Sequence, residues 1–417
     1  MNHFMYKADE LYAEDVSIKD IVAKVGSPAY IYSHATLERH FKAFDDAFAG
    51  MPHTICYSLK ANSNQSVLKT FFNLGGGVDI VSGGELYRSL KAGVDPAKVV
   101  YSGVGKRDEE IEYALNTGIL MFNVESEQEL TRISEIASRM GKKAGIAIRV
   151  NPDVDPGTHP YITTGLKNAK FGITIDRAMD EYTRAATLPG IDIIGIDMHI
   201  GSQLTKVNPF VDSIEKLKLM IAKLRSQGID LGYFDCGGGL GIQYNAEEPP
   251  LPADYGKEIV AATKDLGMHL IFEPGRNLVG NAGILVSTCL FTKARDEKNF
   301  IMIDAGMNDL ARPALYDSFH GVLPVRKDQD GMIVADIVGP ICESGDFLVK
   351  GREVPMFRQG DLMAFMSAGA YGFAMSSSYN SRPRVAEVMV KGGAFEVVRE
   401  RETVEDLIRG EKTASFL

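Results

Sequence analysis

A lysine, a histidine, an arginine, two carboxylates and a run of glycines each stand within or directly after a short apolar stretch of this sequence. They are Lys60, Asp79, Arg149, His199, Gly237 to Gly239 and Glu273. One polar residue in such a place means little, but several in equivalent places indicate a single cleft on which they converge. A lysine there is most often a solvated surface residue. The alternative is a desolvated amine that forms a Schiff base with a carbonyl compound.

The glycine run and its neighbours indicate what such a cleft would bind. Successive backbone N–H groups of Cys236-Gly-Gly-Gly-Leu-Gly241 can close around an anion, although a flexible turn explains the same glycines. The spacing is not that of a dinucleotide fingerprint, and Gly103-Val-Gly-Lys106 lacks the Ser or Thr of a P-loop. Glu273 and Arg276 form either a buried ion pair or a site for a pyridinium ring, whose nitrogen the carboxylate would keep protonated. His199 is either a hydrogen-bonded core residue or a flat ring facing the cleft.

Three further clusters lie in the last part of the chain. Cys342-Glu-Ser-Gly-Asp346 combines a thiol with carboxylates, Arg312 and Tyr316 share one segment, and Tyr371 stands between glycines. Each has a plain structural explanation: a small buried cysteine, a solvated face, and a bulged strand. The functional alternative for Tyr371 is a close approach of the backbone to a ligand.

The elements that must position these residues alternate regularly between residues 54 and 273. Short apolar, β-branched runs predict strands at Thr54–Leu59, Val78–Val81, Val99–Ser102, Met121–Val124, Gly145–Val150, Ile193–His199, Tyr233–Cys236 and Leu270–Phe272. Helical patterns lie between them, as in Pro209–Ser226, where apolar residues recur at three and four. Eight such units predict a (β/α)8 barrel with its active site at the C-terminal ends of the strands. An open doubly wound sheet is the alternative.

The sequence pattern changes after Gly280, where predicted strands follow one another without long helices between them. Such strands are predicted at Ile284–Thr292, Phe300–Ile303, Met332–Val338, Asp361–Phe365 and Val385–Val390, with Gly and Pro between them. We therefore expect a second, mostly β domain, to which the early run Ala29–Tyr32 contributes a strand.

Composition excludes several classes of protein. The chain has 417 residues and a net charge of −10, the opposite balance to that of a protein that binds nucleic acid or anionic lipid. No stretch reaches the ~20 apolar residues of a membrane helix, and the N-terminus lacks the apolar core of a secretory signal. Four cysteines without a CxxC pair argue against a disulfide scaffold or a zinc site and fit a reducing cytoplasm.

Together these motifs, from Pro28-Ala-Tyr-Ile-Tyr32 to Ser381-Arg-Pro383, resemble the fold-type III pyridoxal-phosphate decarboxylases over nearly the whole chain. The resemblance implies a barrel over residues 33–276 that binds pyridoxal 5'-phosphate. It also implies a β domain of residues 1–32 and 277–417 that contributes to the substrate site and to the dimer interface. Members of the family are homodimers that share their active sites, and no metal is expected.

The resemblance also assigns roles residue by residue. Lys60 would hold the cofactor as a Schiff base, His199 would stack on its ring, and Glu273 would pair with the ring nitrogen. Cys342 would donate a proton, reaching in from the partner subunit. The remaining cofactor residues would be Asp79, Arg149, Ser202, Gly238, Gly239, Gly275, Arg276 and Tyr371. The substrate would be held by Arg276, Arg312, Tyr316, Glu343 and Tyr371.

The stretch from Thr158 to Lys167, followed by Lys170-Phe-Gly172, is similar to the branch that decarboxylates meso-2,6-diaminopimelate to L-lysine and carbon dioxide, the last step of lysine biosynthesis. Arg312 suits a second substrate carboxylate, since a guanidinium can grip it bidentately. Three alternatives remain open: an ornithine or arginine decarboxylase of the same fold, an alanine racemase, and an inactive binding protein. Glu273 argues against a racemase, which has an arginine there, and the presence of both Lys60 and Cys342 argues against an inactive protein.

Overall fold

The computed structural model describes residues 2–155, 164–165, 170–296 and 298–417, which form two compact units. One unit comprises residues 38–243 and 247–278, and the other comprises residues 1–37, 244–246 and 279–417. Among the described residues, no helix combines the length and the apolar character that crossing a bilayer requires.

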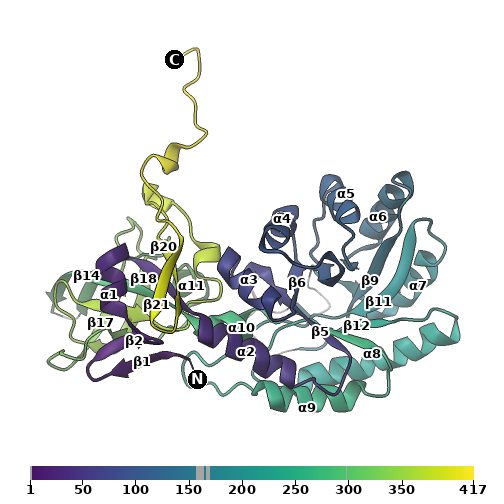
Figure 1. Cartoon of the computed structure of the whole chain (residues 1–417), viewed down its shortest axis with the longest axis horizontal. Coiled ribbons are helices and arrows are strands. Elements are labelled where there is room, and N and C mark those ends of the chain that lie inside the picture. The colour runs from purple at the N-terminus through teal and green to yellow at the C-terminus, as the bar shows by residue number, and fades with distance from the viewer. Residues whose placement is uncertain (1, 156–163, 166–169, 297) are drawn as a thin grey trace. The chain divides into compact units, whose positions relative to one another are not determined.

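The first unit is built around a closed parallel barrel, which confirms the predicted fold (Figure 1). Its strands are β5 (His53–Ser58), β6 (Gly77–Ile80), β7 (Val99–Tyr101), β8 (Met121–Val124), β9 (Ala144–Asn151), β11 (Ile191–Asp197), β12 (Tyr233–Asp235) and β13 (His269–Phe272). They pair in the order β9-β11-β12-β13-β5-β6-β7-β8, and a further pairing of β8 with β9 closes the ring. The short strand β10 (Ile173–Thr174) extends β9.

Helices follow the strands and cover the barrel. They are α2 (His34–Asp46), α3 (Gln65–Asn73), α4 (Gly83–Ala92), α5 (Asp108–Thr117), α6 (Glu127–Arg139), α7 (Ile175–Ala185), α8 (Asn208–Ser226), α9 (Pro252–Thr263) and the short α10 (Arg276–Val279). Two of them begin with the same local signal, because the Ser82 hydroxyl accepts the Glu85 N–H and the Ser126 hydroxyl accepts the Glu129 N–H. A serine that accepts the N–H three residues on is the usual N-cap, and here it starts each helix at the C-terminal end of the barrel.

The register of the barrel strands determines which layer of the barrel contains polar side chains. An apolar cluster of Cys56, Val100, Met121, Ala147 and Ile271 comes from five different strands. At the strand ends, Ser58 pairs with Asp79, Arg149 with Asp197, and Asp197 with Asp235. Because residues in register on neighbouring strands point to the same face, the strand ends bring charged side chains together.

The second unit is mostly β, as predicted. Its main sheet has the order β18-β17-β15-β14-β4-β20-β21, and β19 pairs with both β14 and β16. The strands are β4 (Ala29–Ser33), β14 (Gly283–Arg295), β15 (Lys298–Ile303), β16 (Val322–Pro324), β17 (Met332–Val338), β18 (Phe347–Pro355), β19 (Leu362–Phe365), β20 (Ala386–Lys391) and β21 (Ala394–Arg399). The early strand β4 lies between β14 and β20, which confirms that the N-terminal part contributes a strand to this sheet.

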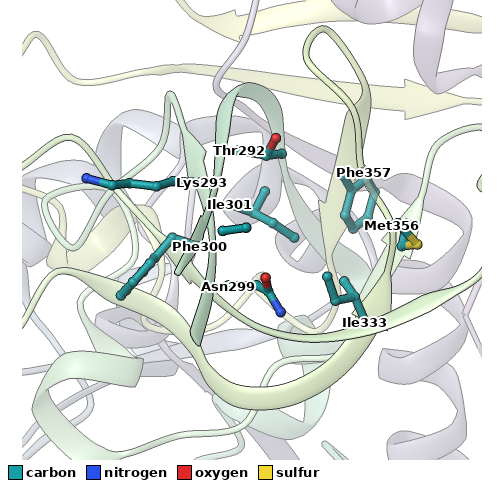
Figure 2. A pocket seen from close by; sticks show the side chains of 9 residues that line it. Thr292, Lys293, Asn299, Phe300, Ile301, Ile333, Met356 and Phe357 are labelled. Atoms are coloured by element: carbon teal, nitrogen blue, oxygen red, sulfur yellow. The ribbon is translucent and has the colours of Figure 1, made fainter. Parts of the chain in front are cut away.

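The same unit also contains the small sheet β1 (Phe4–Lys7), β2 (Glu10–Ala13) and β3 (Val16–Ser17), and the helices α1 (Ile18–Val25) and α11 (Arg312–Tyr316). Figure 2 shows a largely apolar hollow on the main sheet, lined by residues of β14, β15 and β17 together with Met356 and Phe357. None of the predicted site residues lines this hollow.

Candidate active site

Lys60 lies at the C-terminal end of β5, in a 3-10 turn formed by Leu59–Ala61. Its Nζ donates a 2.8 Å hydrogen bond to Asp79 Oδ2 on β6, and the Ser58 hydroxyl donates to the same oxygen at 2.6 Å. The Lys60 side chain remains 36% exposed, whereas the Asp79 side chain is fully buried. A buried carboxylate therefore fixes an amine that can still be reached from outside, which is the arrangement that a Schiff-base lysine needs.

His199 follows β11 by two residues, and its ring is held as a neutral imidazole. The Gly238 backbone N–H donates to His199 Nδ1 at 3.1 Å, so that Nδ1 is an acceptor and carries no proton. Burial, together with the nearby charges of Arg149 and Lys60, lowers the pKa of His199 to about 3. The ring is therefore uncharged at neutral pH, and it offers a flat face rather than a cation.

Glu273 follows β13 and is buried among neutral donors. The Ser102 hydroxyl and the Asn123 side-chain amide each donate to Glu273 Oε1 at 3.2 Å. Its other oxygen, Oε2, lies 3.7 Å from the neutral His199 Nδ1. Among the residues that the structure describes, no lysine or arginine lies within ion-pair distance of Glu273. The site thus presents a carboxylate whose charge no protein cation balances by direct contact.

Arg149, two residues before the end of β9, is held by an acidic residue that the sequence did not single out. Its Nη1 donates to Glu125 Oε1 at 2.9 Å, and both side chains are buried. Burial opposes the charge of Glu125, but Arg149, Lys106 and two backbone N–H groups outweigh it and lower the pKa of Glu125. Burial likewise opposes the charge of Arg149, but Glu125 and its other acidic neighbours raise the pKa of that guanidinium. The pair stays ionised.

The glycine run allows the ends of β12 and β13 to approach each other closely. A Cβ atom at Gly238 would lie 2.1 Å from the Glu273 carbonyl oxygen, and one at Gly239 would lie 2.5 Å from the Gly201 carbonyl oxygen. Gly239 also has a φ of +117°, which side chains rarely adopt. At Gly275, a Cβ would come within 3.0 Å of Ser58 Cβ. Backbone therefore lines this part of the barrel end, as the prediction of an anion-binding loop requires.

Two more predicted residues lie beside these glycines. Arg276 Nη2 donates to the Ser202 hydroxyl at 3.2 Å, and the Arg276 residue is buried. The barrel unit therefore brings together Lys60, Asp79, Arg149, His199, Ser202, Gly238, Gly239, Glu273, Gly275 and Arg276, all in the last residues of its strands or beyond their C-terminal ends.

The other predicted residues belong to the β unit. Cys342 is exposed, and its backbone N–H donates to Asn380 Oδ1 at 2.8 Å. Next to it, Glu343 accepts a hydrogen bond from the Tyr379 hydroxyl, and this bond raises the pKa of Tyr379. The alternative of a small buried cysteine is therefore wrong for Cys342.

Arg312 begins the short helix α11 and is buried, so a solvated face does not describe it. Its guanidinium contacts His320 Nε2 at 3.0 Å and lies over the Tyr244 ring at 4.6 Å. Tyr316 ends the same helix, and Tyr371 has a φ of +54°. The stretch that suggested the substrate falls largely outside the described residues, at 158–163 and 166–169.

Sequence reasoning missed Asn123, Ser102, Asp197, Asp235 and Glu125. All five come from strands or strand ends of the barrel, and Asn123, Asp197 and Asp235 are internal to predicted strands. A polar residue inside an otherwise apolar barrel strand was the available signal, because such a residue needs a partner inside the barrel.

A parallel eight-stranded barrel with a fixed lysine, a neutral histidine and an unbalanced carboxylate at one end is the framework of a pyridoxal-dependent enzyme. The family model for the pyridoxal-binding domain of pyridoxal-dependent decarboxylases matches residues 34–280. The chain is 51% identical to the diaminopimelate decarboxylase of Vibrio cholerae, over 98% of each chain. It is 50% identical to that of Pseudomonas aeruginosa, over 99% of each.

Solved structures agree with these relatives. Diaminopimelate decarboxylase from Helicobacter pylori, complexed with L-lysine, superposes with a TM-score of 0.91 at 41% identity, over 94% of this chain and 98% of that one. Diaminopimelate decarboxylase from M. jannaschii, also in complex with L-lysine, gives a TM-score of 0.94 at 34% identity, over 100% of both chains. The chain belongs to the pyridoxal-dependent decarboxylases, in the group of the diaminopimelate decarboxylases.

The residues at the barrel end fit pyridoxal phosphate. Lys60 offers an accessible amine for the aldehyde of the cofactor, and the uncharged His199 offers a flat surface for its ring. The buried Glu273 lacks a contacting lysine or arginine among the described residues, so a protonated pyridine nitrogen is its natural complement. The closely packed glycines leave backbone rather than side chains where a phosphate would lie.

Proposed function

We propose that the protein removes one carboxyl group of meso-2,6-diaminopimelate as carbon dioxide and releases L-lysine, with pyridoxal phosphate as its cofactor. The observation that carries the reaction is the grouping of Lys60, Asp79, neutral His199 and Glu273 at one end of the barrel. The substrate is inferred from the relatives named diaminopimelate decarboxylase at about 50% identity, and from the neighbours complexed with L-lysine.

When bound, pyridoxal phosphate supplies an aldehyde that reacts with amines and a protonated ring that withdraws electrons from the bond being broken. Lys60 Nζ is the amine that would hold the cofactor and would give way to the substrate amine. Asp79 keeps this Nζ in place through the 2.8 Å hydrogen bond. Because His199 is neutral, it supports the ring without competing for its electrons.

Glu273 would keep the proton on the ring nitrogen of the bound cofactor, and Glu125 fixes Arg149, which would support the cofactor from β9. Ser202, Gly238, Gly239, Gly275 and Arg276 would hold the phosphate of the cofactor. Tyr371 belongs to the same cofactor-binding set.

The residues of the β unit act on the substrate. Arg312, with Tyr316 and Arg276, binds the distal carboxylate, and the buried, aromatic-stacked guanidinium of Arg312 suits that role. Glu343 faces the distal amino group, and Tyr371 lies beside the substrate. Cys342 Sγ delivers the proton that replaces the lost carboxyl group on the α-carbon. We further propose that Cys342 and Glu343 act in the site of the partner subunit of a homodimer, in the cytoplasm.

The alternative of an ornithine or arginine decarboxylase has weaker support. The lysine/ornithine decarboxylase of Vibrio vulnificus shares the fold at a TM-score of 0.79, but it is only 22% identical to this chain. The full-length relatives at about 50% identity favour diaminopimelate.

A substrate panel tests the proposal. The protein loaded with pyridoxal phosphate is offered meso-diaminopimelate, L-ornithine, L-arginine and L-lysine separately, and carbon dioxide and amine products are measured. We expect L-lysine from diaminopimelate alone, and no turnover by Lys60→Ala. The exposed Lys206→Ala serves as a control that keeps full activity. Turnover of ornithine instead would overturn the assigned substrate, and turnover by Lys60→Ala would overturn the assigned lysine.

Mixing subunits tests the shared site. Lys60→Ala and Cys342→Ala homodimers are each expected to be inactive. If the sites are shared, heterodimers of the two regain one intact site and part of the activity. Verified heterodimers without activity would contradict the role of the partner.

A further inference from the structure

Three carboxyl groups meet at the ends of neighbouring barrel strands. Asp197 ends β11, Asp235 ends β12, and Glu273 follows β13. One carboxyl oxygen from each lies within 4.8 Å of those of the other two, and all three residues are at most 4% exposed. Only Glu273 has a place in the proposed function, so the other two carboxyl groups need an explanation.

The surroundings offer too little positive charge for three carboxylates. Among the described residues, the nearest cation is Arg149, whose Nε lies 4.0 Å from Asp197 Oδ2 while its Nη1 is bound to Glu125. Lys60 is bound to Asp79. The other titratable groups of the described residues that face the cluster add negative charge or none: they are Asp79, Glu125, His199, Cys56, Cys236, Tyr182 and Tyr255. Three full negative charges at this spacing in a buried site would repel one another strongly.

The hydrogen bonds show a shortage of donors at the same place. Asn123 Nδ2 lies 3.1 Å from Asp235 Oδ2 and 3.2 Å from both Glu273 Oε1 and Ser102 Oγ, which is three acceptors for two N–H groups. Within the described part of the chain, the buried Asn123 Oδ1 and Asp197 Oδ1 have no hydrogen-bond partner. Buried acceptors without donors are costly, and a protonated carboxyl group is a donor.

We propose that Asp197 and Asp235 hold protons taken up from solvent when the barrel folds, and that with Asn123 they are positioning residues which leave Glu273 as the ionised carboxylate of the group. Two further observations agree with this assignment. Burial, with Glu273 adding to it, raises the pKa of Asp197 well above its usual value. Burial, with Glu273 and Asp197 adding to it, does the same for the pKa of Asp235.

The consequence concerns the charge that receives the cofactor. Because Asp197 and Asp235 are neutral, the one negative charge of the cluster lies on Glu273. This is the carboxylate that would contact the cofactor ring. The role of Glu273 rests on the proposed function, whereas the protonation of Asp197 and Asp235 does not.

Infrared spectroscopy of the protein without cofactor tests the protonation directly. A protonated carboxyl group has a carbonyl stretching band that is separate from those of carboxylates and amides. We expect this band in the wild-type protein at about pH 9, where ordinary carboxyl groups are ionised. The band should weaken in Asp197→Asn and in Asp235→Asn. Glu387→Gln is the control, because Glu387 is equally buried but paired with Arg399, and it should leave the band unchanged.

Cofactor affinity gives a second readout. An amide replaces a neutral carboxyl group with little change in size or charge, and Asn123 can turn its unpartnered oxygen towards the new N–H. We therefore expect the two Asp→Asn variants to keep the dissociation constant for pyridoxal phosphate within about threefold, a fraction of the ~1.4 kcal/mol that a tenfold change represents. Asp235→Ala should raise it about tenfold or more, because it leaves Asn123 unpaired.

Each result decides the proposal. Absence of the carboxyl band in the wild type, or equal bands in the wild type and both Asn variants, would overturn it. A band that weakens as expected supports it even if Asp235→Ala fails to fold. Because the spectrum uses no substrate, a protein that shows the band but turns over none of the amino acids would overturn only the proposed function.

Discussion

Replacing Gly238 with alanine should disable the active site although no side chain of the site is removed. The added Cβ would lie 2.1 Å from the Glu273 carbonyl oxygen, whereas carbon and oxygen atoms in contact are normally about 3.3 Å apart. The ends of β12 and β13 must therefore separate by roughly 1 Å. Overpacking of this kind costs about 1–3 kcal/mol of stability, and a 1 Å displacement of reacting groups costs about a hundredfold in rate.

The shift affects two of the proposed site residues together. The Gly238 N–H holds His199 Nδ1, and the clash is with the backbone of Glu273. We expect kcat/KM for carbon dioxide release from diaminopimelate to fall about a hundredfold and the affinity for pyridoxal phosphate to fall with it. Denaturant unfolding measures the accompanying loss of stability.

Gly232→Ala is the matched control, since Gly232 precedes the same strand. A Cβ there meets its nearest atom, the Ile194 carbonyl oxygen, at 3.8 Å, and Gly232 does not have a positive φ. This variant should keep its activity and remain within about 0.5 kcal/mol of the wild-type stability. Wild-type activity in Gly238→Ala would refute the reasoning, as would an equal loss in both variants.

Three further predictions concern single residues. The folded-state pKa of His199, about 3, lies below its unfolded value, so its contribution to stability is present above pH ~6.5 and is lost as pH falls, by about 1.4 kcal/mol per pH unit. When the protein without cofactor is denatured at pH values from 7 to 5, the free energy of unfolding should therefore change less steeply with pH in His199→Asn than in the wild type. An equally steep change in both proteins would contradict this pKa. Burial raises the pKa of Asp309 to about 7, so its contribution to stability is present below pH ~3.9 and is lost as pH rises towards 7. Asp309→Asn should remove this loss, and an equal pH dependence of the free energy of unfolding in both proteins would count against the raised pKa. Asn380 accepts the Cys342 N–H at 2.8 Å with a φ of +55°, so Asn380→Gly keeps the backbone but loses the acceptor. Asn380→Gly should lower kcat about fivefold and change the rate of Cys342 alkylation, Asn380→Asp should retain most of both, and equal behaviour of the two variants would rule out the bond as the cause.

The barrel could be predicted from the sequence because its signals are local and repeat. Short β-branched runs alternate with helical patterns. The structure contains all eight predicted strands, and each predicted end lies within two residues of the observed one. The candidate site residues of the barrel could be proposed for the same reason, since Lys60 and Glu273 follow predicted strands and His199 ends one. That His199 is neutral could not be predicted, because it depends on the Gly238 N–H and on burial.

The other site features could not be predicted because they depend on pairing between distant residues. Glu125 looks like a helix-start residue in the sequence, and only the register of β8 and β9 brings it to Arg149. Asn123 looks like an isolated polar residue, although it joins Asp235 to Glu273 across the barrel. The strands β16, β18 and β21 carry mixed polar and apolar residues, and their periodicity was too weak to predict them.

The position of β4 has a consequence for how the chain folds during its synthesis. All five residues of β4 are buried, between β14 on one side and β20 on the other. Its partner Ala386 is made 357 residues after Ala29, which at about 5–20 residues per second takes roughly 20–70 s. The barrel strands emerge in the meantime and can pair with one another, whereas β4 keeps apolar side chains exposed and both of its edges without hydrogen-bonded partners. Chaperone binding to the nascent chain, and losses to aggregation at fast expression, should therefore concentrate on β4 rather than on the barrel.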